Sequence, residues 1–106
     1  MKVLLVKPHE EPKVVEIENT LDAKQEIVGG FIEMVIPPSH TDDAVIICNE
    51  LGKCMGLQLN RCLRLANGHI YDVIAGTFFI CRAPWDSEGF ESLTDEQIEI
   101  YSKMYA

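Results

Sequence analysis

The chain has 106 residues, 47% of them hydrophobic and 25% charged, which is the composition of one ordinary globular domain. Its 17 acidic and 9 basic residues leave a net charge of −8, so we expect no direct binding to the phosphate backbone of a nucleic acid. No apolar run approaches the ~18 residues of a membrane span, and the start lacks the pattern of a secretory signal. We therefore expect a cytoplasmic protein that does not bind membranes.

The first predicted elements are two strands, Met1–Val6 and Val14–Ile17, separated by a polar loop. They form a hairpin or a pair of neighbouring strands. In the second strand Val15 and Ile17 alternate with acidic residues, which predicts one buried and one solvated face. The first strand is apolar nearly throughout, so we expect it to be the more buried of the two.

A short helix is predicted from Leu21 to Val28, because Asn19 or Thr20 can cap its first turn and Gly29–Gly30 ends it. Phe31–Ile36 reads as a strand that stops at two prolines. The polar loop that follows contains Ser39, His40 and Asp42. Residues crowded so closely cannot take the separate orientations of a catalytic triad, so we interpret them as loop formers.

Ala44–Cys48 and Lys53–Leu57 flank a turn signal at Asn49–Gly52, which predicts a hairpin. In that register Cys48 faces Cys54, and Asn49 faces Lys53. The 4 cysteines match no C-x-x-C pair and no zinc-finger spacing. We expect free thiols in a reducing cytosol and no metal or cofactor; the alternative is that oxidation joins the two facing cysteines.

Asn60–Leu65 fits either a helical turn or a strand, and Asn67–Gly68 is a tight-turn signal. Ile70–Ile80 is apolar at nearly every position after Asp72, which predicts one long central strand covered on both faces. Gly76 within it indicates a bulge, a bend or the close approach of another backbone or a ligand.

The clearest helix start is at Thr94, which can cap the backbone while Gln97 reaches back to form a capping box. Ile98, Tyr101 and Tyr105 then share one stripe, so the C-terminal helix should dock on the sheet. The chain is thus expected to form a single α+β domain over residues 1–106. Its sheet should be mainly antiparallel, with five or six strands, a short helix after strand two and the C-terminal helix packed on one face.

No activated nucleophile, metal-ligand cluster or phosphate cradle is visible, so we expect a protein without enzymatic activity. The best binding hypothesis is a small anionic ligand held by paired guanidinium donors and a directional amide. Its residues are Asn60, Arg61 and Arg64, with Tyr71 and Thr77 nearby if the long strand borders the same pocket. The alternative is that both arginines form surface ion pairs with the abundant acids.

Charge is uneven, since the stretch from Asp86 to Glu99 holds six acids and no base. This acidic surface either solubilises the protein or mimics a nucleic acid toward a basic partner.

Six blocks of the sequence, MKVLLVKP, VVEIENTL, QEIVGGFIEMV, CNELGKCMGLQLNRCLR, NGHIYDVIAGTFFI and LTDEQIEIY, resemble an uncharacterised family of small domains found in bacteriophages and mobile elements of Gram-positive bacteria. The resemblance implies an accessory protein of such an element, and these proteins often counter host defence. Two hypotheses follow: sequestration of a nucleotide-type immune signal, or an acidic inhibitor, of the anti-CRISPR or anti-restriction type, that occupies the nucleic-acid-binding groove of a host nuclease. A plain structural module and a homo-oligomer stay open.

Overall fold

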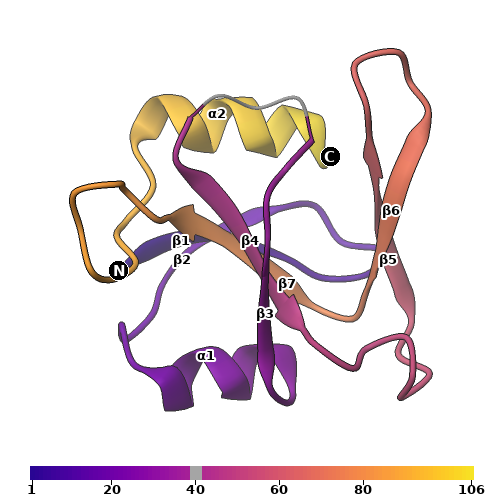
Figure 1. The fold of residues 1–106 in the computed structure, drawn as a ribbon, viewed down its shortest axis with the longest axis horizontal. Helices are drawn as coiled ribbons and strands as arrows, with labels where there is room; N and C mark the ends of the chain where they lie inside the picture. Colours follow the sequence, from indigo (N-terminus) through magenta and orange to yellow (C-terminus); the bar gives the residue numbers. More distant parts are fainter. Residues whose placement is uncertain (39–41) are drawn as a thin grey trace.

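The computed structural model describes residues 1–38 and 42–106, so the expected loop residues Ser39 and His40 lie outside the described part. The fold is α+β, as expected, with seven described strands instead of five or six and the predicted helix after strand two (Figure 1). The elements in chain order are β1 (Lys2–Val6), β2 (Lys13–Glu16), α1 (Leu21–Val28), β3 (Ile32–Val35), β4 (Ala44–Asn49), β5 (Leu59–Arg64), β6 (Ile70–Ala75), β7 (Phe78–Arg82) and α2 (Asp95–Met104).

The strands form a five-stranded sheet in the order β2-β1-β7-β4-β3 and a separate two-stranded sheet of β5 and β6. Every pairing is antiparallel. The N-terminal hairpin is confirmed, with Val3 opposite Val15, and β1 is more buried than β2. Placing β7 at the centre of the larger sheet accounts for its run of fully buried apolar residues.

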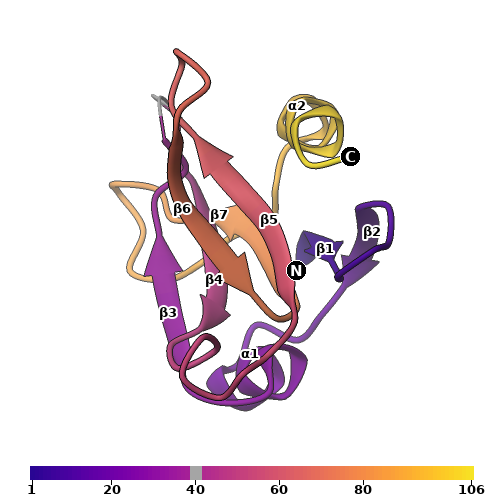
Figure 2. The same ribbon diagram turned by 90° about the vertical axis from the view of Figure 1, so that its right-hand side faces the viewer.

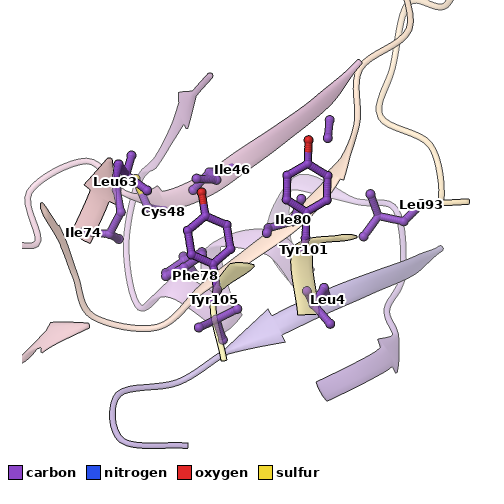
Figure 3. Packing of buried hydrophobic residues seen from close by; sticks show 12 residues of the cluster. Leu4, Ile46, Cys48, Leu63, Ile74, Phe78, Ile80, Leu93, Tyr101 and Tyr105 are labelled. Carbon is purple, nitrogen blue, oxygen red and sulfur yellow. The ribbon is translucent and has the colours of Figure 1, made fainter. Parts of the chain in front are cut away.

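The two helices cover opposite faces of the larger sheet (Figures 1 and 2). On one face α2 inserts Tyr101 and Tyr105 among side chains of β1, β4 and β7, and the β5–β6 hairpin adds Leu63 and Ile74 to the same cluster (Figure 3). The ring of Tyr105 meets that of Phe78 edge to face at 6.0 Å. On the other face Val28 of α1 packs with a second cluster, made of Val3, Val45, Ile47, Phe79 and Cys81.

Both helices begin where the sequence predicts. The hydroxyl of Thr20 accepts the amide of Ala23, and α1 ends at Gly29 in the left-handed conformation. Thr94 and Gln97 form the expected capping box at α2. These signals are local, since each depends on residues three or four positions apart, which is why they can be recognised without knowledge of the fold.

The predicted hairpin of Ala44–Cys48 with Lys53–Leu57 is wrong. The turn at Asn49–Gly52 is present, with the amide of Gly52 donating to the carbonyl of Asn49, but the chain then continues through turns to Gly56. β4 instead pairs with β3 and β7, so Cys48 lies opposite Glu33 and not Cys54. A strand buried on both faces gains most from two partner strands within the core; here these are the preceding strand β3 and the distant β7.

The single strand expected from Ile70 to Ile80 is also wrong, because the chain bends at Gly76 and divides into β6 and β7. Gly76 has a φ of 84°, a conformation that glycine adopts without steric cost. The bend, one of the three interpretations of this glycine, is therefore confirmed, and it passes the chain from one sheet to the other. Of the alternatives for Asn60–Leu65, the strand is correct.

Gly52 offers a test of how the turn segment packs on β6. A Cβ atom at this position would lie 2.7 Å from the carbonyl oxygen of Ala75, a backbone atom, whereas a Cβ on Gly89 would meet nothing within 4 Å. We expect Gly52→Ala to lower the free energy of unfolding by about 2 kcal/mol, since the backbone must move. Gly89→Ala should change it by less than about 0.5 kcal/mol. Urea denaturation of both variants measures the difference, and equal losses would contradict the packing.

Candidate binding surfaces

The side chain of Asn60 joins the two sheets. Its amide nitrogen donates to the carbonyl of Val6 at the end of β1 and to the carbonyl of Gly76 at the bend, each at 2.9 Å. Both donor hydrogens of this amide are thus used by the backbone. Asn60 therefore serves the architecture of the bend, and the directional amide expected for a ligand is occupied.

The guanidinium of Arg61 is also occupied by hydrogen bonds within the protein. Its Nε donates to the carbonyl of Tyr105 at 2.7 Å, its Nη2 to the carbonyl of Glu10 at 2.6 Å, and its Nη1 to Oδ1 of Asn60 at 2.8 Å. One guanidinium thus ties the end of α2 and the β1–β2 loop to β5. Neither Arg61 nor Arg64 pairs with a carboxylate among the described residues, so surface ion pairs are not their role either.

The other expected ligand residues lie apart from this contact. Arg64 is exposed, and its Nη1 donates to the carbonyl of Gly68 at 2.9 Å. It lines a groove of about 360 Å³ with Pro38, Cys62, Leu65, Ala66, Met104 and Tyr105. Tyr71 on β6 has 60% of its surface exposed, and Thr77 lies between β6 and β7. The structure thus brings Asn60 and Arg61 together but places Arg64 in a separate groove.

The two arginines predict different mutational effects. Arg61→Ala removes four hydrogen bonds to oxygen acceptors, so we expect the free energy of unfolding to fall by about 2 kcal/mol. Arg64→Ala is the matched control, because the side chain is exposed, and it should cost less than about 0.5 kcal/mol. Thermal and urea denaturation measure both. Comparable losses in the two variants would show that Arg61 does not have this structural role.

The acidic segment from 86 to 99 divides into paired and unpaired residues. Glu91, Asp95 and Glu99 lie 3.7, 3.6 and 3.2 Å from Arg82, Lys2 and Lys103. The other three acids have no ion-pair or hydrogen-bond partner within the described part of the chain, and all are exposed: Asp86, Glu88 and Glu96. Half of the segment is therefore available to an outside partner.

An apolar pocket lies beside the start of this segment and was not anticipated from the sequence. It has a volume of about 380 Å³, and one of its lining residues is Trp85, whose side chain is fully exposed. Met34 and Ile36, on or just after β3, are each about half exposed at the same pocket. We call the apolar lining the Trp85 patch; it consists of Met34, Ile36, Ala44, Val45, Ala83 and Trp85. The available signal was the lone tryptophan in a Pro84–Asp86 loop, where no core position would place it.

Acidic side chains connect the Trp85 patch to a second, polar pocket of about 490 Å³. Asp42 and Asp43 line both pockets, and Glu96 lines the second. The carboxylate of Asp42 accepts the hydroxyl of Tyr101 at 2.9 Å, while Asp43 accepts Nε2 of Gln97 at 2.9 Å. Burial, and then this carboxylate, raise the pKa of Tyr101, so the hydroxyl stays a donor. The two carboxylates are thereby held in fixed positions.

A third pocket, a cleft of about 230 Å³, separates β3 from β6. It is lined by Glu33, Val35, Cys48, Glu50, Lys53, Cys54 and residues 72–75. Nζ of Lys53 lies 2.6 Å from the carboxylate of Asp72, and this hydrogen bond lowers the pKa of Asp72. The same carboxylate accepts the amide of Val73 at 2.7 Å. We call this pocket the acidic cleft, since it contains three carboxylates and one ammonium group.

The cysteines of the acidic cleft are both free thiols. Burial raises the pKa of Cys48 to about 11, so this thiol is a poor nucleophile at neutral pH. Cys54 is exposed. A group of three or more side chains able to hold a metal does not occur among the described residues, and no described helix is long and apolar enough to span a membrane.

Comparison with known proteins gives one match. A family model described as a domain of unknown function, DUF3846, matches residues 1–106. A search of curated proteins and a search of solved structures found no match.

Proposed function

The chain belongs to the DUF3846 family, whose function is unknown, and we propose that it is a small non-enzymatic binding protein that docks on a basic surface of another protein. We further propose that it is an accessory protein of a phage or mobile element and that its target is a host defence nuclease. The observation that carries the proposal is the fully exposed Trp85, which lies where an apolar pocket meets fixed and free carboxylates.

The chemistry of this surface suits a protein partner. Tryptophan is among the residues that dominate binding energy at interfaces, and an exposed apolar patch with a polar rim is typical of an interaction site. The carboxylates of Asp42 and Glu96 extend the surface on one side, beside Asp43, which is paired with Arg82 at 3.1 Å. Asp86 and Glu88 lie just after Trp85 in the sequence. A groove that binds nucleic acid presents arginine and lysine, which gives it the complementary charge.

The surface predicts two variants that should lose binding while remaining folded. Trp85→Ala should weaken inhibition of the target nuclease at least 30-fold, as expected for a buried tryptophan anchor worth about 2 kcal/mol. Asp86→Lys with Glu88→Lys should slow association and reduce its salt dependence, since exposed charges are screened by salt. The matched control is Asp22→Lys with Glu26→Lys on α1, which makes the same change of charge away from the pocket.

A panel of purified restriction and CRISPR nucleases, assayed for DNA binding and cleavage with the chain added, provides the measurement. Trp85 is the only tryptophan, so a blue shift of its fluorescence reports its burial on docking. The proposal fails if a nuclease is inhibited without a change in this fluorescence, if the α1 control loses as much activity as the surface variant, or if the panel shows no inhibition.

A second proposal keeps the small anionic ligand, now centred on Arg64. It is supported by the exposure of this guanidinium in a groove of about 360 Å³ and by the free donors that one hydrogen bond leaves. Calorimetry with cyclic nucleotides and ADP-ribose should then show binding that Arg64→Ala abolishes without loss of stability. Absence of binding to all of these ligands would remove the idea.

A further inference from the structure

β3 is the edge strand of the larger sheet, with β4 on one side and no described strand on the other. The amide of Glu50 donates to the carbonyl of Phe31 at 2.8 Å, so Phe31 points its backbone toward β4. In an antiparallel ladder the backbone groups of successive residues point alternately toward and away from the partner strand, so those of Glu33 and Val35 also point toward β4. The amides and carbonyls of Ile32 and Met34 point away from it. We call these four groups the β3 edge.

Two other strand edges are better protected than that of β3. At the other end of the sheet β2 has the same length as β3 but carries two exposed charged residues, Lys13 and Glu16, whereas β3 carries only Glu33, and charged side chains discourage pairing. Across the acidic cleft, the amide of Val73 in β6 is occupied by the carboxylate of Asp72. The β3 edge has no such cap among the described residues, and half-exposed Met34 gives it an apolar face.

We propose that the β3 edge accepts an extended segment of a partner protein in which apolar and basic residues alternate. Strand addition supplies the backbone hydrogen bonds, and pockets for alternate side chains supply the specificity. One set of added side chains would lie beside Met34 and Ile36, on the face of the sheet that α1 covers. The other set would lie beside Glu33, at the acidic cleft.

The charge of the cleft decides the chemistry of the second set. Glu33, Glu50 and Asp72 line it, and Lys53 neutralises only Asp72 directly. Lysine or arginine side chains in the added strand would meet the two remaining carboxylates. A second copy of this chain fits poorly, because pairing β3 with itself would bring the acids of two molecules together, each with a net charge of −8. This inference does not depend on the proposed docking at Trp85.

The test uses a synthetic peptide of three Lys-Val repeats with blocked ends, titrated into isotope-labelled protein. At saturation the amides of Ile32 and Met34 should exchange with solvent at least tenfold more slowly, while that of Glu33, already directed at β4, should change little. A peptide of three Glu-Val repeats should bind at least tenfold more weakly. Two further peptides are N-methylated, one at its lysines and the other at its valines, so that each lacks the backbone donors along one edge of the added strand. Only the peptide that lacks the donors facing β3 should lose binding.

Two protein variants separate the backbone from the charge. Met34→Pro removes an amide that is not part of the ladder with β4, so the sheet should persist, and peptide affinity should fall at least tenfold; Met34→Val keeps the amide and is the control. Glu33→Lys should also weaken binding tenfold, whereas Glu18→Lys, on an exposed residue elsewhere, should not.

Three results would overturn the proposal. The first is the absence of binding, or binding without slower exchange at Ile32 and Met34. The second is that both N-methylated peptides bind as tightly as the unmethylated one. This result would exclude backbone hydrogen bonds to the β3 edge, even if Met34→Pro does not fold. The third is a dimer in sedimentation experiments with these two amides already protected in the free protein, which would identify a second copy as the occupant.

Discussion

The two hydrogen bonds from the Asn60 amide to the carbonyls of Val6 and Gly76 hold the architecture together. At Gly76 the chain leaves the small sheet and enters the centre of the large one, so carbonyls at this bend lose the regular partners of a ladder. Asn60 supplies those partners from β5, and Arg61 beside it fixes the end of α2 and the β1–β2 loop. Two consecutive polar residues thereby set the position of the β5–β6 hairpin against the core, and hence the width of the acidic cleft.

The same pair shows why a ligand site inferred from residue types can be misleading. Asparagine and arginine are typical of anion recognition because they donate in fixed directions, but a backbone carbonyl at a bend requires those donors equally. Sequence spacing places Asn60 and Arg61 side by side; it carries no information that Val6, Gly76 and Tyr105 converge on them. Trp85 presents the opposite case, since its place in the Pro84–Asp86 loop indicates exposure from the sequence, but only the fold shows that β3 and β4 provide an apolar pocket beside it.

Elements whose determinants are local could be predicted, and those set by distant pairing could not. The caps at Thr20 and Thr94 and the β1–β2 hairpin depend on short spacings, and they occur where expected. The segment after β4 has a correct turn at Asn49–Gly52 but no second strand, because β4 is already paired on both edges with β3 and β7. The apolar pattern around Gly76 is the same for one long strand and for two shorter strands. The two possibilities differ only in which sheet each half joins, which the pattern does not show.

The high net charge of this protein offsets the tendency of its exposed apolar residues to cause aggregation. An open strand edge flanked by Met34 and Ile36, near a fully exposed Trp85, is a surface on which identical molecules tend to aggregate. A charge of −8 on a chain of 106 residues opposes that association through mutual repulsion, at a modest cost to the compact state. Toward the basic partner proposed above the same charge would be attractive, so it would help to select what the apolar surface binds. The carboxylates of Asp42 and Asp43 are held by Tyr101 and Gln97, so binding of such a partner would cost little ordering entropy.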